Sequence, residues 1–227
     1  MAADPSFSRR RELVVLCVLL AITATTFVLL TADVWHANRQ VALDRLAAKL
    51  GIAEGKDGAL GGHPRQAEMA ARLGSRKGVG LATAALVGVA LLWRQWVAAL
   101  VCLLAPAVCF VAVEHVAKPL INAPVPFGGR SYPSGHAAGV AAVTISAIFL
   151  LYRRWGGLVA MLVAPLAAAP VIAVGLGVLA LGFHHYPTDV IGGALLAGTV
   201  VATLGATLSW AADRVRPRRH PLGAVER

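Results

Sequence analysis

Charged residues are scarce in this sequence. Lysine, arginine, aspartate and glutamate make up 14% of the 227 residues, whereas hydrophobic residues make up 58% and the mean hydropathy is +0.70. Soluble proteins carry roughly 25% charged residues, so this composition excludes an ordinary soluble domain. The apolar residues also form long runs instead of a helical or strand-like alternation, which predicts that lipid surrounds most of the chain.

Cysteine is also rare, and no secretory cleavage signal stands out. The three cysteines, Cys17, Cys102 and Cys109, lie within apolar runs without C-x-x-C spacing, so we interpret them as small hydrophobic residues. Three arginines at 9–11 precede the first apolar run. Because this run has the length of a membrane span and no clear A-x-A site follows it, we expect a retained anchor and not a cleaved signal peptide.

The net charge is +10, with 21 basic and 11 acidic residues. The basic residues lie between the apolar runs and at the two ends of the chain, so they do not indicate a nucleic-acid-binding surface. We interpret them instead as topology signals, since short cytoplasmic loops of membrane proteins are rich in lysine and arginine. No nucleic-acid partner is expected.

The apolar runs predict an all-α integral membrane protein with six transmembrane helices. The predicted spans cover residues 13–32, 78–93, 96–116, 135–152, 158–181 and 190–210. All five tryptophans lie at the ends of predicted spans, which is typical of the aromatic belt at a membrane interface.

Loop charges set the expected topology. Residues 1–12 form a cytoplasmic N-terminus, residues 13–212 the six-span membrane domain, and residues 213–227 a basic cytoplasmic tail. The long connection 33–77 then lies outside the membrane on the extracytoplasmic side. Its segment 41–52 has near-helical apolar spacing, which predicts an amphipathic helix at the membrane surface.

Two polar segments interrupt the apolar pattern on the expected outer face. Residues 130–136 (Arg-Ser-Tyr-Pro-Ser-Gly-His) precede the fourth span, and residues 184–189 (His-His-Tyr-Pro-Thr-Asp) precede the sixth. A helix start offers free backbone N–H groups and a favourable dipole for anions. Lys118 ends the third span on the same face, and we interpret the three regions together as one phosphate site.

His185 and Asp189 are spaced to share one helix face. An aspartate that accepts one imidazole N–H leaves the other ring nitrogen free as a nucleophile. The alternative is that the pair only caps the sixth span. A zinc site made of His136, His184, His185 and Asp189 is a further alternative, but Lys118 and the helix start favour phosphate over a cation.

Residue by residue, this layout resembles the type 2 phosphatidic acid phosphatase (PAP2) superfamily of acid and lipid phosphatases. Its signature reads Lys-x6-Arg-Pro, then Pro-Ser-Gly-His, then Ser-Arg-x5-His-x3-Asp. The resemblance covers about 97–212, and the middle part is intact at 133–136. The first part retains Lys118 but has Val125 at the arginine position, and the third retains His185 and Asp189.

The third part also departs from the signature, because Val178 and Leu179 replace its Ser-Arg pair. Two phosphate-binding arginines are therefore missing. Arg130, four residues before Ser134, is one candidate to supply a guanidinium from the outer loop. The alternative is an ordinary loop base at the level of the lipid headgroups.

The resemblance implies a PAP2-like helical bundle and a role for each matching residue. His185 would attack phosphorus to form a phosphohistidine, with Asp189 orienting it, and His136 would protonate the leaving group. Lys118, with the Ser134 and Gly135 region, would bind the phosphate oxygens. The implied chemistry needs no metal and no cofactor.

We therefore expect a phosphatase that acts on a lipid phosphate, a prenyl or glycerolipid phosphomonoester or diphosphate, among the membrane lipids. The Ala-, Gly-, Val- and Arg-rich composition indicates a bacterial protein, so the expected location is the cytoplasmic (inner) membrane with the active site facing outside. One alternative is a catalytically degenerate relative that binds a lipid phosphate or a partner protein. Another is a phosphotransferase, in which an acceptor other than water takes the phosphoryl group.

Overall fold

Helices form almost the whole described part of the chain. The structure is a computed structural model and describes residues 5–36, 41–50, 63–121, 131–181 and 185–215. The elements are α1 (Pro5–His36), α2 (Ala42–Lys49), α3 (Pro64–Leu73), α4 (Arg76–Leu92), α5 (Trp96–Val111), the π-helical η2 (Ala112–Ala117), α6 (Lys118–Ile121), α7 (Gly135–Trp155), α8 (Gly157–Ala180) and α9 (Pro187–Val215). No strand occurs in these ranges, so the predicted all-α class is confirmed.

Five helical stretches are long and apolar enough to cross a membrane. They are Arg10–His36, Trp96–Ile121, Gly135–Trp155, Gly157–Ala180 and Pro187–Val215. The count rises to six if α3 and α4, which meet at a bend of 48°, form one span. The chain is a multi-pass membrane protein with a helical bundle.

Several helices extend beyond the spans predicted from hydropathy. α1 continues to His36, into the predicted connection, and α9 continues to Val215. α6 (Lys118–Ile121) extends the helical stretch beyond residue 116, the predicted end of the third span. Apolar runs mark only the lipid-buried part of a helix, whereas its backbone hydrogen bonds continue into the interface. Of the predicted amphipathic segment 41–52, α2 covers Ala42–Lys49 and the last two residues lie outside the described ranges.

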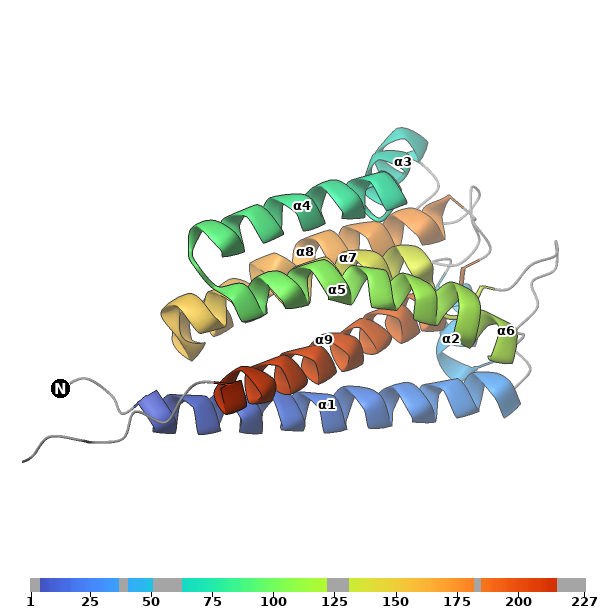
Figure 1. Ribbon diagram of the computed structural model, residues 1–227. Coiled ribbons are helices and arrows are strands. Elements are labelled where there is room, and N and C mark those ends of the chain that lie inside the picture. The colour runs from blue at the N-terminus through green and yellow to red at the C-terminus, as the bar shows by residue number, and fades with distance from the viewer. Residues whose placement is uncertain (1–4, 37–40, 51–62, 122–130, 182–184, 216–227) are drawn as a thin grey trace, which may run out of the picture.

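α9 lies inside the bundle and packs against α1, α5 and α7, while α7 also packs against α8 and α4 (Figure 1). The core consists largely of small side chains. Completely buried alanines include Ala90, Ala98, Ala105, Ala142 and Ala197. Small residues let helix backbones approach closely where lipid provides no hydrophobic driving force between helices.

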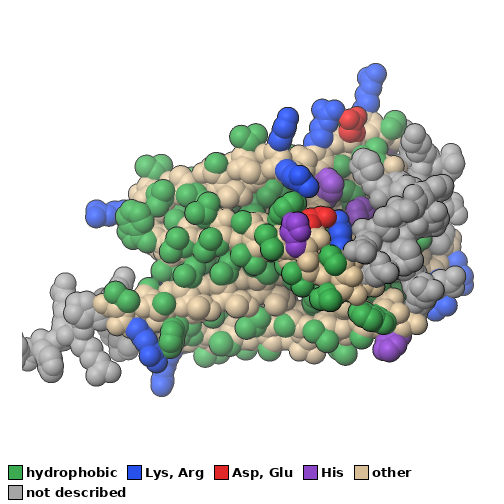
Figure 2. Space-filling view, turned by 45° about the vertical axis from the view of Figure 1, so that its right-hand side comes forward, with side chains coloured by type: hydrophobic (Ala, Val, Ile, Leu, Met, Phe, Trp, Pro, Cys, Tyr) green, Lys and Arg blue, Asp and Glu red, His purple; other side chains and the backbone are tan. Residues whose placement is uncertain are grey.

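The short helices α2, α3 and α6 gather at one end of the bundle (Figure 1). At that end the first turn of α9 bonds to α2, because the Thr188 hydroxyl donates to Oδ2 of Asp44 at 2.7 Å. In the space-filling view, histidine, acidic and basic side chains gather toward this end, beside a mostly hydrophobic face (Figure 2). One group of polar side chains therefore lies where α7 and α9 begin.

Candidate functional site

The turn that opens α7 is built on a buried serine. Ser134 is the N-cap of α7, and its hydroxyl accepts a hydrogen bond from the Ala137 N–H at 3.4 Å. Because this side chain ends the turn and caps the helix, Gly135 and His136 become the first two helical residues. The helix start thus presents backbone N–H groups and an imidazole together.

Tyr132 stabilises the same turn through contacts with α1 and α9. Its hydroxyl lies 3.0 Å from the Thr31 Oγ1 of α1. Its ring is completely buried against Gly192 of α9, where an added Cβ would lie 2.6 Å from the ring. Burial raises the pKa of the Tyr132 hydroxyl to about 12, so this group is neutral at neutral pH. The Tyr132 side chain therefore packs between α1 and α9 and holds the turn against both helices.

His185 is oriented by a buried carboxylate. Its Nδ1 lies 3.2 Å from Oδ2 of Asp189, in the first turn of α9. Asp189 is 2% exposed, and the same oxygen accepts the backbone N–H of Tyr186 at 2.9 Å. A carboxylate that accepts Nδ1–H selects one tautomer of the imidazole, which leaves the Nε2 lone pair available.

One main-chain hydrogen bond joins the two polar segments. The Ser134 N–H donates to the carbonyl oxygen of Asp189 at 2.9 Å. Gly193, about one turn further along α9, permits this approach, since a Cβ there would lie 2.5 Å from the Ser134 carbonyl oxygen. The starts of α7 and α9 are therefore locked together.

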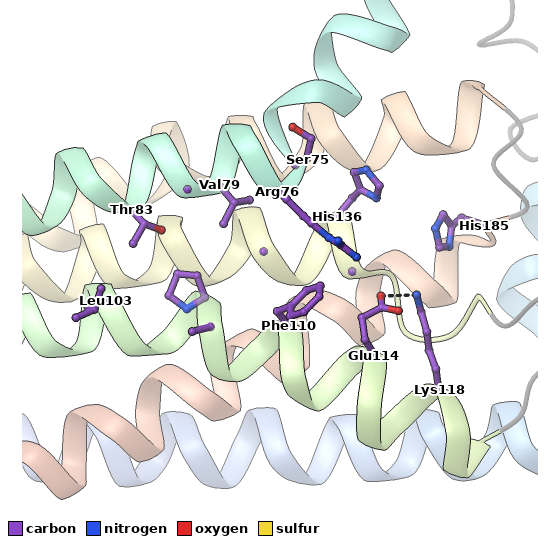
Figure 3. Close-up of a pocket in the computed structure, with 16 residues that line it drawn as sticks. Ser75, Arg76, Val79, Thr83, Leu103, Phe110, Glu114, Lys118, His136 and His185 are labelled. Carbon is purple, nitrogen blue, oxygen red and sulfur yellow. Dashed lines mark hydrogen bonds and ion pairs between the residues drawn. The ribbon is translucent and has the colours of Figure 1, made fainter.

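A cavity of about 690 Å³ lies beside this junction, and Figure 3 shows the residues that line it. Its polar end is formed by Arg76, Glu114, Lys118, Gly135, His136 and His185. Its other end, along α4 and α5, is mostly apolar, with Thr83 as its polar residue among Val79, Gly80, Leu103, Pro106, Ala107 and Phe110. The cavity therefore combines a charged head with an apolar channel parallel to the spans.

An ion pair dominates the electrostatics of the polar end. The Lys118 Nζ lies 2.6 Å from Oε1 of Glu114 (Figure 3). Glu114 belongs to the π-helical η2, and Lys118 follows directly in α6. A π-helical turn changes which side chains face inward and is frequent at functional sites. Here Val113 is completely buried, while Glu114 and Lys118 both reach the cavity.

The structure brings most of the sequence-predicted residues together. Lys118, Gly135, His136 and His185 all line the cavity, and Asp189 lies directly behind His185. Ser134 is different, because it is buried beneath the turn and does not line the cavity. Other predicted positions lie outside the described residues: Val125, Arg130 and His184.

Sequence reasoning missed one wall of this cavity. Arg76 and Ser75, at the start of α4, line it on the side that faces α5, and Phe110 lines it from α5. Arg76 lies in the predicted 33–77 connection, where its charge does not distinguish it from the other bases. The available signal was its position directly after a helix N-cap, where the Ser75 hydroxyl accepts the Gly78 N–H at 3.2 Å.

The zinc alternative finds no support in the described residues. Within them, no three or more histidine, cysteine, aspartate or glutamate side chains are grouped to hold a metal ion. His184, which that alternative also used, lies outside them.

Comparisons with known proteins address the fold and the family. No curated protein matches this chain. Among solved structures, a transmembrane PAP2-type phosphatidylglycerolphosphate phosphatase from Bacillus subtilis matches with a TM-score of 0.65 and 19% identity. The alignment covers 88% of this chain and 98% of that one. At this identity, the likeness establishes a common fold.

The model of the PAP2 superfamily matches residues 113–216. This region contains Glu114, Lys118, His136, His185 and Asp189, and begins after α4. The match and the common fold agree with the signature residues gathered at the cavity. Residues 113–216, just under half of the 227-residue chain, are thus similar to the PAP2 superfamily.

Proposed function

We propose that this protein is a membrane phosphatase that hydrolyses a lipid phosphate, a prenyl or glycerolipid phosphomonoester or diphosphate. The observation that carries the proposal is the two-ended cavity. Its polar end contains His136, His185 and Lys118, and its other end is an apolar channel. A lipid phosphate matches both ends, whereas a water-soluble phosphate ester leaves the channel unused.

In the first step, the His185 Nε2 attacks phosphorus and a P–N bond forms. Asp189 accepts the Nδ1–H, 3.2 Å away, and stabilises the positive charge that develops on the ring. The P–O bond to the leaving group breaks as His136 donates a proton to that oxygen. The lipid leaves as its alcohol, or as a monophosphate when the substrate is a diphosphate.

In the second step, water attacks the phosphohistidine. His136, now neutral, accepts a proton from this water, the P–N bond breaks, and inorganic phosphate is released. Lys118 and the backbone N–H groups at the start of α7 stabilise negative charge on the phosphoryl oxygens in both steps. Fixed donors of this kind are the main source of catalysis in phosphoryl transfer, and the scheme requires no metal ion.

The topology belongs to the proposal as well. We propose that residues 1–12 and 213–227 are cytoplasmic, and that the cavity opens on the outer face of a bacterial inner membrane. The arginines at 9–11, Arg94 and the pair at 153–154 support this orientation, because the positive-inside rule assigns their side to the cytoplasm.

The direct test is phosphate release by the purified protein in detergent. The panel includes phosphatidic acid, phosphatidylglycerol phosphate and undecaprenyl phosphates, each with and without EDTA. We expect EDTA-insensitive release that is lost in His185→Ala and His136→Ala and retained in His36→Ala, a histidine exposed on α1. Absence of release across the panel would overturn the proposal.

A lipid-phosphate-binding protein without turnover is the second candidate. Leu179 favours it, because this buried leucine occupies the position of a signature arginine. The two candidates differ in one measurement, since only an enzyme forms a base-stable phosphoenzyme at His185. A phosphotransferase would form the same intermediate but release little phosphate until an acceptor alcohol is supplied.

A further inference from the structure

We propose that Arg76, the first residue of α4, binds the phosphate oxygens of the substrate in place of the arginines missing from the signature. The identity of the ligand rests on the proposed function. The assignment of the residue rests on the geometry of the cavity. Arg76 precedes the matched region 113–216, so the family signature does not assign it.

Arg76 projects into the polar end of the cavity. It lines the same cavity as Lys118, His136 and His185, and its side chain extends from α4 toward Glu114 and Lys118 (Figure 3). Its Cζ lies 4.8 Å from the centre of the Phe110 ring. This cation–π contact stabilises the extended side chain, so the guanidinium is oriented before a ligand arrives.

The charges that line the cavity favour an anionic ligand. Its wall contains two permanent cations, Arg76 and Lys118, and one carboxylate, Glu114. Glu114 already pairs with Lys118 at 2.6 Å. Among the described residues, Arg76 has no carboxylate within ion-pair distance, so it is the uncompensated cation that a phosphate dianion meets.

The positions of the signature Ser-Arg pair are not available for this role. Val178 is completely buried and packs with Ala71, Val140 and Val174 between α3, α7 and α8. Leu179 is 7% exposed. α3 covers this part of α8 so closely that a Cβ on Gly177 would lie 2.7 Å from the Ala67 carbonyl oxygen. Apolar packing against α3 therefore replaces the guanidinium here.

The packing of α3 on α7 and α8 also places Arg76 at the cavity. α3 and α4 are joined at Gly74, where an added Cβ would lie 3.0 Å from the carbonyl oxygen of His136. The α3–α4 turn thus rests directly on the start of α7, and Arg76 follows two residues later. A guanidinium donates two parallel hydrogen bonds to a phosphate, a geometry that lysine cannot reproduce.

The test compares Arg76→Ala, Arg76→Lys and the matched control Lys77→Ala in the full chain in detergent. Lys77 is the neighbouring exposed base and does not line the cavity. Orthovanadate, a phosphate analogue, is titrated calorimetrically, so the readout needs no turnover. We expect Arg76→Ala to weaken vanadate binding roughly 10- to 100-fold, Arg76→Lys to recover part of the loss, and Lys77→Ala to bind within about twofold of wild type.

Each outcome decides the inference. Wild-type affinity in Arg76→Ala, an equal loss in Lys77→Ala, or no vanadate binding by the wild-type protein would overturn it. If Arg76→Ala does not fold, Arg76→Gln decides, with melting temperature as the check. If the wild type binds vanadate but releases no phosphate from any lipid, the phosphatase proposal fails while Arg76→Ala still tests the anion site. Restoration of binding in Arg76→Ala by added guanidinium ion would support direct contact.

Discussion

Glu114 and Lys118 pair across the junction of η2 and α6, with Oε1 and Nζ 2.6 Å apart. Glu114 also lies against the start of α7, since a Cβ on Gly135 would be 3.1 Å from the same Oε1. This carboxylate therefore occupies the region where Lys118 and the helix start attract an anion. Substrate phosphate must compete with it.

Glu114→Gln is accordingly expected to tighten the binding of phosphate analogues. Removing the negative charge frees Lys118, and we expect orthovanadate affinity to rise roughly three- to tenfold, an effect typical of one partly exposed charge. Inhibition of phosphate release measures this affinity. Glu68→Gln is the matched control, because Glu68 forms an i,i+4 pair with Arg72 at 2.7 Å on the exposed surface of α3. Unchanged or weaker vanadate binding in Glu114→Gln would mean that Glu114 positions Lys118 instead.

Asp189→Asn is expected to impair the chemical step more than binding. Asp189 accepts hydrogen bonds from the His185 ring and the Tyr186 N–H but does not line the cavity. An asparagine neither selects the required tautomer nor stabilises the charged ring, so kcat should fall roughly 100-fold or more. Single-turnover phosphoenzyme formation measures this step. Vanadate affinity should change less than threefold, and an equal loss of both would indicate a general distortion of the site.

The sequence was sufficient to predict the helical bundle and the part of the candidate site that lies at the starts of α7 and α9. Long apolar runs determine where lipid-buried helices lie, and the Pro-Ser-Gly-His turn and His-x3-Asp spacing mark two helix starts by local chemistry. His136, His185 and Asp189 were identified in this way, and Lys118 by its position at the end of the third predicted span and its match to the PAP2 signature. These features depend on residues close together in sequence.

The opposite wall of the site could not be predicted, because it depends on packing between distant helices. Arg76 lines the same cavity as His136 because Gly74 and Gly177 let α3 rest on α7 and α8. Glu114 faces the cavity in a π-helical segment, and hydropathy does not report a π turn. Charge counts likewise gave no reason to single out Arg76 among the bases of the 33–77 connection.

Asp44, which lies in the 33–77 connection, stabilises the start of α9. It is 5% exposed, and its carboxylate accepts the Thr188 N–H at 3.1 Å as well as the Thr188 hydroxyl. Asp44 of α2 thus caps the start of α9 at Thr188, and Thr188 directly precedes Asp189. We expect Asp44→Ala to lower the free energy of unfolding by about 1–2 kcal/mol and to reduce kcat.

Thermal denaturation in detergent, read beside initial rates, measures both effects of Asp44→Ala. Asp33→Asn, at an exposed position on α1, is the control and should leave both unchanged. Wild-type stability and turnover in Asp44→Ala would show that α2 does not support the active site.

The apolar end of the cavity gives a test of lipid selectivity. Gly80 of α4 lines the cavity, and a Cβ added there meets no atom within 4 Å. Gly80→Leu should therefore fold normally and place its side chain in the channel proposed for the lipid chain. We expect kcat/KM for a long-chain lipid phosphate to fall roughly tenfold or more.

A short-chain, water-soluble ester separates this effect from damage to the catalytic residues. Its hydrolysis should be nearly unchanged in Gly80→Leu, because the polar end is intact. Gly88→Leu is the matched control, since Gly88 lies on the same helix with equally open surroundings but does not line the cavity. It should retain activity toward both substrates. Equal losses on long and short chains in Gly80→Leu would contradict the assignment of the channel, because a steric block of the lipid chain cannot slow a substrate that lacks one.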